Sequence, residues 1–350
     1  MNVLFTAGGT LGHIYPAISI INEYKKKRPD DKIYFVSSIK DIGYFNNINH
    51  KIDYIYTFDV FGIEKNIFKL LISIYKNILA YIKIKKLLKE KEIDVVFGMG
   101  GYISGICIKA AHKLKIKTAI HEQNSIMGRS NRMCLKYSDA VFTTFKLDIY
   151  HKNKHLVGNP RYDDVRSFLN ESVKNKKHIL ITSGTNGSKI INEFAVKFLN
   201  SCDSLNYYTT LVTGKKYYDE VCKRVNNGNH YEILPFSNDM ITLINSSGIV
   251  ITRSGSTTIS EILALKSIPI FVPSPNVTDN HQYFNALNIV NSGVGILIEE
   301  KDLTIDNVIK RLNEINLNYN QYICRLNEYR SINNISLIID ELIKLGDING

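Results

Sequence analysis

Residues 8–13, Gly-Gly-Thr-Leu-Gly-His, are the first stretch of the sequence whose residue types could do chemistry. They follow the apolar run Val3-Leu4-Phe5. Glycines in such a turn let the backbone approach a phosphate or a sugar closely. His13, near the start of the following helix, is a candidate proton acceptor at neutral pH. The alternative is a tight strand-to-helix turn in which Thr10 caps the helix.

A second candidate site is the stretch 253–261, Arg-Ser-Gly-Ser-Thr-Thr-Ile-Ser-Glu, which follows the apolar run 249–251. Small residues at a helix start leave backbone amides that can bind a diphosphate. Glu261, one turn into that helix, can accept hydrogen bonds from two hydroxyls of a ribose. The alternative is an ordinary capped helix in which Glu261 interacts with the helix dipole.

Four further polar or glycine-rich stretches follow predicted strands. Residues 98–105 hold four glycines, which indicates close approach by another group. Residues 121–124, His-Glu-Gln-Asn, come after the predicted strand 118–120 and are typical of ligand contact. Residues 183–188 form a generic phosphate or sugar cradle without the lysine of a P-loop. Residues 279–285 either contact sugar hydroxyls or form a polar helix entry.

The elements that must position these residues alternate along the chain. Short β-rich runs such as 3–7 and 178–182 alternate with helix-period segments such as 14–27 and 216–226. This pattern is typical of βαβ units in a parallel sheet. A turn and a polar segment within 158–177 interrupt it. We therefore predict an α/β fold of two doubly wound, Rossmann-like domains that face each other across a cleft, where the carboxyl ends of the strands bind ligands.

Composition narrows the environment and the partners. The 350 residues include 44 basic and 33 acidic side chains, a net charge of +11 that favours anionic partners. Five scattered cysteines, without a C-x-x-C pair, favour reduced thiols, a cytosolic compartment and no structural metal site. The chain begins directly with a predicted strand and has no apolar run of membrane-spanning length, so we expect neither secretion nor a membrane span. The cysteines are Cys107, Cys134, Cys202, Cys222 and Cys324.

The predicted helix 64–91 combines a basic row with two apolar stripes. The basic row is Lys65, Lys69, Lys76 and Lys83. The stripe predicted to face the core is Ile67, Leu71, Ile74 and Ile78, and the second stripe, beside the lysines, is Phe68, Ile72, Tyr75 and Leu79. Such a helix suits an anionic membrane surface. The alternative is that a second helix covers the second stripe and that the lysines are merely solvated.

In their order, the stretches GMGGYISG, HEQNSIMGRSNR and RSGSTTISE resemble the MurG family of bacterial peptidoglycan N-acetylglucosaminyltransferases, which have the GT-B fold. The similarity runs from residue 2 to about 300 and is weaker beyond. It implies inverting transfer of GlcNAc from UDP-GlcNAc to the 4-hydroxyl of MurNAc in lipid I, the undecaprenyl-diphosphate-linked MurNAc-pentapeptide. The product would be lipid II for peptidoglycan synthesis, and with it cell-wall growth, cell shape and division.

The resemblance also implies an organisation and a location. Residues 1–160 would form the acceptor- and membrane-binding domain, and residues 161–332 the UDP-GlcNAc-binding domain. A C-terminal helix at about 333–348 would pack back on the first domain. The protein would be peripheral, on the cytoplasmic face of the bacterial cell membrane, with no nucleic-acid partner. No cofactor is implied, and no D-x-D motif on a plausible metal-binding loop indicates dependence on a divalent metal.

Residue roles follow from the positions that match the family's motifs. His13 is the candidate base, and Thr10, Leu11 and Gly12 lie in the loop around the sugar and the diphosphate. The other substrate-binding candidates are Tyr102, Asn124 and Asn131 on the acceptor or sugar side, Arg161, Thr185 at the donor diphosphate, Ser237 at the uracil, Ser256, Thr257, Thr258, Ile259, Ser260 and Glu261 in the nucleotide segment, and Gln282 and Asn285 at the GlcNAc hydroxyls.

The sequence departs from the family pattern in a few places, and other functions stay open. Leu11 replaces a glycine, and we expect its side chain to point away from the cleft. Arg161 comes one position early, Thr185 replaces a serine, and His281 replaces the first of two glutamines. The alternatives are another GT-B UDP-sugar transferase acting on a lipid acceptor such as diacylglycerol, a UDP-GlcNAc epimerase, and a catalytically inactive scaffold.

Overall fold

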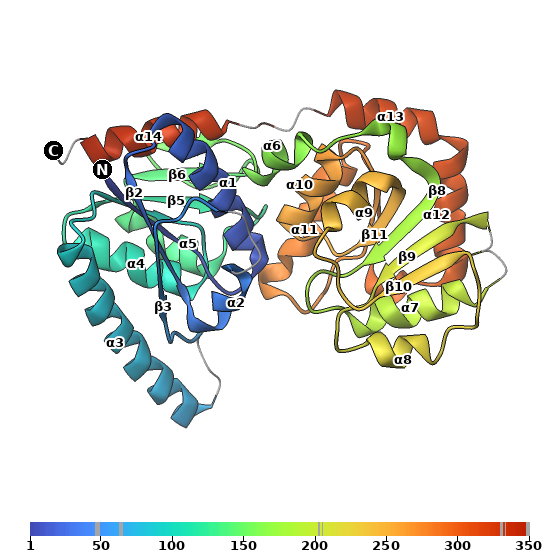
Figure 1. Ribbon diagram of the computed structural model, residues 1–350, viewed down its shortest axis with the longest axis horizontal. Helices are drawn as coiled ribbons and strands as arrows, with labels where there is room; N and C mark the ends of the chain where they lie inside the picture. Colours follow the sequence, from blue (N-terminus) through green and yellow to red (C-terminus); the bar gives the residue numbers. More distant parts are fainter. Residues whose placement is uncertain are drawn as a thin grey trace. The chain divides into compact units, whose positions relative to one another are not determined.

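The structure, a computed structural model, describes every residue except 46–49, 63–65, 202, 203, 205, 330, 331, 333 and 348–350. Cys202 therefore lies outside the described residues. The chain divides into two compact units (Figure 1). Unit 1 contains the described residues of Met1–Arg161 and of the segment from Ile332 onward, and unit 2 those from Tyr162 to position 331.

Unit 1 is built on a seven-stranded parallel sheet with the strand order β3-β2-β1-β4-β5-β6-β7. Its strands are β1 (Asn2–Thr6), β2 (Lys32–Ser38), β3 (Tyr54–Phe58), β4 (Val95–Gly98), β5 (Lys117–Glu122), β6 (Ala140–Thr143) and β7 (Lys154–Leu156). Its helices are α1 (Leu11–Lys27), η1 (Ile39–Asp41), α2 (Ile42–Phe45), α3 (Ile67–Glu90), α4 (Tyr102–Lys113), α5 (Arg129–Cys134), η2 (Leu135–Tyr137) and α14 (Ile335–Asp347). The order reverses between β1 and β4, where doubly wound sheets bind ligands.

Both faces of this sheet are covered, which explains the continuous apolar strands of the sequence. Val3 and Phe5 pack with α1 and α14 on one face, and Leu4 packs with α3 and α4 on the other. Ile338 and Leu342 of α14 are buried in the first of these clusters. The C-terminal helix thus completes the core of unit 1, far along the chain from the strands it covers.

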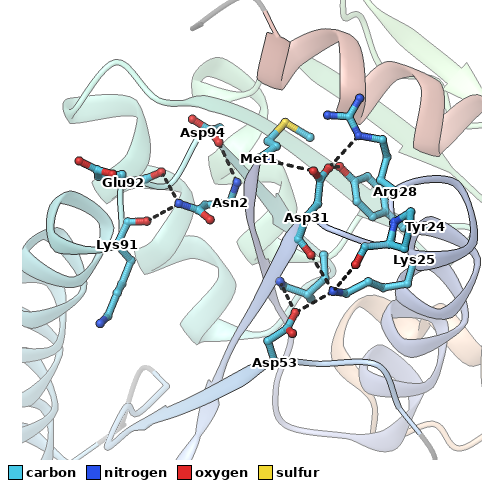
Figure 2. Close-up of polar contacts among 12 residues, drawn as sticks. Met1, Asn2, Tyr24, Lys25, Arg28, Asp31, Asp53, Lys91, Glu92 and Asp94 are labelled. Atoms are coloured by element: carbon cyan, nitrogen blue, oxygen red, sulfur yellow. Dashed lines mark hydrogen bonds and ion pairs between the residues drawn. The ribbon is translucent and has the colours of Figure 1, made fainter.

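Polar contacts hold the strands of the same sheet together at their amino-terminal ends (Figure 2). The Asp31 carboxylate accepts hydrogen bonds from the Met1 ammonium at 2.9 Å and from the Tyr24 hydroxyl at 2.7 Å. Burial, together with the bond to Asp31, raises the pKa of Tyr24 well above its usual range. The Asp94 carboxylate accepts from the Asn2 backbone N–H at 2.7 Å. Carboxylates therefore connect β1, β2 and β4 at the amino-terminal ends of the strands. The glycine turns lie at the carboxyl ends.

Unit 2 repeats the architecture in a six-stranded parallel sheet with the order β10-β9-β8-β11-β12-β13. Its strands are β8 (Asn175–Thr182), β9 (Tyr208–Val212), β10 (Tyr231–Leu234), β11 (Ser247–Thr252), β12 (Ile268–Phe271) and β13 (Ile296–Leu297). Its helices are α6 (Arg161–Arg166), η3 (Glu171–Val173), α7 (Lys189–Leu199), α8 (Tyr218–Cys222), α9 (Met240–Ser246), α10 (Ser256–Ala264), η5 (Thr278–Asn280), α11 (His281–Val290), η6 (Glu300–Asp302), α12 (Ile305–Leu317) and α13 (Tyr319–Glu328).

The predicted α/β class with two doubly wound sheets is confirmed, with local corrections. The helix predicted over 216–226 is only Tyr218–Cys222, because the turn after Gly214 delays its start and Asn226-Asn227-Gly228 ends the segment. Strand β5 continues to Glu122, so His121 and Glu122 are strand residues and do not follow the strand. The change from apolar to polar residues after Ile120 suggested that the strand ends there, but the strand continues to Glu122.

The predicted core stripe of helix α3 is wrong. Ile67, Leu71 and Ile78 are 63, 59 and 53% exposed, and Ile74 is exposed as well. The helix contacts α4 instead through a seam that begins with the small residues Ser73 and Ala80 and continues with Ile84, Leu87 and Leu88. Helical periodicity alone could not tell which stripe has a partner. Lys65, predicted in the basic row, lies outside the described residues.

The alternative of a second helix over the other stripe is also contradicted, because Phe68, Ile72 and Tyr75 are exposed. Figure 1 shows α3 extending away from the sheet of unit 1 along its amino-terminal half. Over the part of the chain that the structure describes, no helix is both long and apolar enough to cross a membrane.

Candidate active site

Two glycine turns meet at the carboxyl ends of β1 and β4. A Cβ atom on Gly101 would lie 2.4 Å from the Gly8 carbonyl oxygen, and one on Gly100 would lie 3.0 Å from Cδ2 and Nε2 of His13. Gly100 and Gly101 have φ angles of 108° and 86°, in the left-handed region that favours glycine. The four-glycine stretch is thus explained by backbone packing against the residue 8–13 loop and the His13 ring.

His13 is held by the loop that precedes it. Its ring nitrogen Nδ1 lies 3.0 Å from the Gly8 carbonyl oxygen, and its backbone N–H donates to the Thr10 carbonyl at 3.2 Å. A carbonyl oxygen only accepts, so Nδ1 carries the proton and Nε2 is the accepting nitrogen of the neutral ring. Thr10 is the N-cap residue of α1, but its side chain makes no capping bond, so the alternative capping role is not supported.

Glu122 organises the loop between β5 and α5. Its carboxylate is 2% exposed and accepts from the Asn124 backbone and side-chain nitrogens at 2.9 and 3.1 Å. Its second oxygen accepts from the Gly128 N–H at 3.0 Å and from Asn131 Nδ2 at 2.8 Å. We had no sequence signal for this role, because a buried carboxylate and a ligand contact look the same in a polar motif.

Asn131, predicted on the acceptor or sugar side, is buried and makes hydrogen bonds within unit 1. Its side chain is 3% exposed, and Nδ2 also donates to the His121 carbonyl at 3.0 Å. Asn131 therefore supports Glu122 and β5 from inside the unit. Asn124, by contrast, is half-buried at the surface end of the same loop.

His121 is fully buried beneath this loop. Its Nε2–H donates to the Gly158 carbonyl at 3.0 Å. Burial lowers the pKa of His121 to about 4, although the bond to Gly158 acts in the opposite direction. The residue is neutral at physiological pH and joins β5 to the turn after β7, so it is structural and does not reach for a ligand.

Four other predicted site residues lie in unit 1. The Arg161 guanidinium stacks on the Tyr15 ring, with its carbon 4.6 Å from the ring centre. Tyr102, the first residue of α4, is 52% exposed, and a Cβ on Gly62 would lie 2.6 Å from its ring. Leu11 and Gly12 open α1 and are half-buried.

In unit 2, Arg253 connects the turns at the carboxyl ends of the strands. Its guanidinium donates to the Ser188 hydroxyl at 2.7 Å and to the Val272 carbonyl at 2.9 Å, and it forms an ion pair with Glu300. A Cβ on Gly187 would lie 2.2 Å from the Thr213 carbonyl oxygen, so this loop also packs backbone to backbone. Arg253 was part of the predicted motif without a role, and the structure gives it a supporting one.

The start of α10 is the anion-binding candidate of unit 2. Gly255 caps this helix without a side chain, and the first turn holds no acidic residue. Ser256, Thr257, Ile259 and Ser260 are buried, and the Ser260 hydroxyl donates to the Ser256 carbonyl at 2.9 Å. Thr258 and Glu261 are half-exposed. The predicted nucleotide segment therefore offers backbone and these two side chains, while Ile259 and Ser260 are internal.

The remaining predicted site residues of unit 2 lie on α11, which holds Gln282 and Asn285, and in loops, which hold Thr185 and Ser237. Asn285, predicted at the GlcNAc hydroxyls, is fully buried, and its Nδ2 donates to the Ser254 carbonyl at 3.2 Å. Gln282 is half-buried, and its Oε1 accepts from the Ser274 N–H at 2.9 Å. Thr185 is exposed in its loop, and the half-buried Ser237 accepts from the Asp239 N–H at 3.1 Å.

Neither the cysteines nor the potential metal-ligating side chains indicate a second site among the described residues. Cys107 and Cys134 are free and buried, and burial raises the pKa of each to about 12. Cys222 and Cys324 are free and exposed. Within the described ranges, no three His, Cys, Asp or Glu side chains are grouped so that they could hold a metal ion.

Comparison with known proteins gives the class. Residues 3–143 match the N-terminal domain of glycosyltransferase family 28, and residues 178–340 match its C-terminal domain. Two doubly wound units with these matches define a GT-B glycosyltransferase of that family. A crystal structure of MurG from Acinetobacter baumannii covers 98% of this chain and 99% of its own, with a TM-score of 0.75 and 21% identity.

The sequence comparison defines the family more narrowly. The UDP-N-acetylglucosamine–N-acetylmuramyl-(pentapeptide) pyrophosphoryl-undecaprenol N-acetylglucosamine transferase of Finegoldia magna is 35% identical over 335 residues, covering 90% of this chain and 89% of the relative. The chain belongs to this family, the MurG transferases. A UDP-GlcNAc 2-epimerase from Neisseria meningitidis shares the fold, with a TM-score of 0.68 at 14% identity over 98% of this chain and all of the other.

Buried neutral His121 predicts a pH-dependent stability. Between its ordinary pKa of 6.5 and its folded value of about 4, the unfolded chain binds more protons, so stability falls as the pH drops through this window. From pH 7 to pH 5 the loss from this residue is roughly 2 kcal/mol. Urea unfolding at both pH values should show this loss in the wild type and not in His121→Gln.

The control is His112→Gln, because His112 is exposed on α4 in the same unit. It should keep the wild-type pH dependence. An equal pH dependence in His121→Gln and the wild type would contradict the buried neutral state of His121.

Proposed function

We propose that this chain is an inverting transferase that moves GlcNAc from UDP-GlcNAc to the 4-hydroxyl of MurNAc in lipid I, giving lipid II. The observation that carries the proposal is the fixed ring of His13 in a chain of the MurG family. A single displacement needs a base on the acceptor hydroxyl and stabilisation of the departing UDP. The two units divide these tasks.

Unit 1 supplies the base and the acceptor contacts. His13 Nε2 takes the proton from the MurNAc 4-hydroxyl as that oxygen bonds to the anomeric carbon, and the bond to the UDP oxygen breaks. The residues proposed to contact the acceptor or the sugar are Thr10, Leu11, Gly12, Tyr102, Asn124 and Arg161. Because Asn131 is buried against Glu122, it acts as a positioning residue on this side.

Unit 2 supplies the donor site. The positive end of α10, whose first turn holds no acidic residue, stabilises the diphosphate of the departing UDP. Glu261 accepts from the ribose hydroxyls, the backbone of Ser237 contacts the uracil, and Thr185 lies at the diphosphate. Gln282 contacts the sugar, whereas buried Asn285 positions Ser254 beneath it.

Helix α3 is proposed to bind the anionic cytoplasmic surface of the bacterial cell membrane, which makes the protein peripheral. Phe68, Ile72 and Tyr75 are 74, 56 and 63% exposed, a large apolar surface for a helix in water. Lys69 and Lys83 are exposed on the same helix. Apolar side chains entering the headgroup region, with lysines on anionic lipid, would bring the site to a lipid-linked acceptor.

The first test is transfer of labelled GlcNAc to a lipid I analogue by the wild type and by His13→Ala. Loss of the base should lower kcat by about 10²–10⁴-fold. His112→Ala, on the exposed face of α4, should leave kcat unchanged.

Full turnover by His13→Ala would remove His13 as the base. Wild-type transfer only to diacylglycerol would favour the other lipid-acceptor transferase. Conversion of UDP-GlcNAc without any acceptor would favour an epimerase.

A second test concerns Glu261. The substitution Glu261→Gln keeps the shape but removes the charge that strengthens hydrogen bonds to the ribose, so KM for UDP-GlcNAc should rise about tenfold with little change in kcat. Calorimetry with UDP should show the same weakening. Glu220→Gln, at an exposed position on helix α8, is the matched control, and equal KM values in both variants would refute the ribose contact.

A third test addresses the membrane helix. Co-sedimentation with anionic vesicles should fall several-fold for Phe68→Ser/Tyr75→Ser and for Lys69→Glu/Lys83→Glu. Raising the salt concentration should weaken wild-type binding. The control Lys197→Glu/Lys223→Glu makes the same charge change at exposed positions in unit 2. Wild-type binding by both α3 variants would exclude this surface.

A further inference from the structure

One peptide group lies between His13 and a buried carboxylate. The Gly8 carbonyl accepts from His13 Nδ1 at 3.0 Å, and the Gly9 N–H donates to Asp41 Oδ2 at 3.0 Å. These carbonyl and N–H groups belong to the same peptide unit, the one that joins Gly8 to Gly9. A continuous path therefore runs from the Asp41 carboxylate through a single amide to the imidazole.

We propose that Asp41 is a positioning residue that acts on His13 through the Gly8–Gly9 peptide, an inference that rests on the proposed role of His13 as the base. A carboxylate that accepts from an amide N–H polarises the amide and makes its carbonyl oxygen a stronger acceptor. That oxygen holds the Nδ1 proton of His13. The hydrogen bond between the Gly8 carbonyl oxygen and the Nδ1 proton becomes stronger once Nε2 has accepted the substrate proton, because the ring is then positive.

The surroundings of Asp41 suit this role. Asp41 ends the 3-10 turn η1 and is 3% exposed. The hydroxyl of fully buried Ser37 lies 3.0 Å from the same carboxylate oxygen and 2.7 Å from the Ala7 carbonyl, which fixes the carboxylate against the loop. A Cβ on Gly8 would lie 3.0 Å from Asp41 Oδ2 and 2.8 Å from Ile103, so a glycine is needed for this approach.

The other charged groups near the ring are arranged differently. Glu122 accepts four hydrogen bonds, which come from the β5–α5 loop and from Asn131 of α5. Arg161 stacks on Tyr15, on the same helix as His13, and Lys40 reaches outward over the Phe61 ring at 5.0 Å. The β4–α4 turn faces the ring with the uncharged Gly100. Hydrogen bonds thus connect the Asp41 carboxylate to the imidazole through one peptide group.

The first glycine loop uses one of its backbone amides internally, because the Gly9 N–H donates to Asp41. The loop holds the proposed base: the substrate proton enters at Nε2, while Nδ1 keeps its own proton on the Gly8 carbonyl.

The test measures the imidazole directly, in a way that does not depend on activity. In Asp41→Asn, the amide oxygen can still accept from the Gly9 N–H, but the charge is lost. The NMR titration midpoint of the His13 Cε1–H should fall by about half a pH unit or more, because the protonated ring loses its support. Asp94→Asn is the matched control, since Asp94 also accepts a backbone N–H (Figure 2) but lies at the amino-terminal end of β4. Its His13 midpoint should equal that of the wild type.

Activity supplies the second reading. In Asp41→Asn, the acid limb of the kcat/KM profile with the lipid I analogue should move to lower pH by the same amount. We expect kcat to fall about tenfold at unchanged KM. A measurement on the unmodified protein covers the case in which Asp41→Asn does not fold: the Gly9 amide resonance should titrate with the His13 midpoint.

The outcomes separate the two proposals. An unchanged His13 midpoint in folded Asp41→Asn, or a Gly9 amide that ignores His13 ionisation, overturns the relay. A shifted midpoint in a protein that transfers nothing to lipid I supports the relay and refutes the proposed function.

Discussion

The close approach of two backbone turns, at Gly8 and Gly101, is the constraint on which the rest of unit 1 depends. With only 2.4 Å between a would-be Cβ of Gly101 and the Gly8 oxygen, no other residue type fits there. This contact fixes the Gly8 carbonyl, which in turn fixes the Nδ1 of His13. The switch point between β1 and β4 is thus more than an open crevice, because the backbone that meets there determines where the imidazole stands.

Charged and polar side chains hold the turns of both units from within. Glu122 shapes the loop after β5, Arg253 joins two turns of unit 2 to the end of β12, and Asn285 supports Ser254. Each is a polar group whose burial would be costly without these bonds. Residues in a recognisable motif therefore divide into those that face the surface and those that keep the surface groups in place.

The sequence predicted the strands well because a parallel sheet covered on both faces requires continuous apolar runs, as at Val3–Phe5. It predicted the location of the motifs because loops at the carboxyl ends of such strands carry ligand sites. It did not predict the burial of Glu122 and Asn285, because residue type does not separate a buried support from a ligand contact. It failed at α3, because periodicity shows stripes but not partners. Asp41 gave no signal, because its contact with Gly9 spans 32 residues.

The two units also differ in how they handle charge. In unit 1, hydrogen bonds connect the Asp41 carboxylate through the Gly8–Gly9 peptide to the imidazole of His13. On our proposal, this arrangement favours protonation of His13. In unit 2 the guanidinium of Arg253 is paired with Glu300 and directed at Ser188 and a carbonyl, so its charge is already balanced. On the proposed mechanism, the dipole of α10, whose first turn carries no acidic side chain to oppose it, stabilises the departing diphosphate. On the same mechanism, the buried Asp41 carboxylate supports the base, and the backbone at the start of α10 supports the leaving group. Neither task then needs a mobile charged side chain.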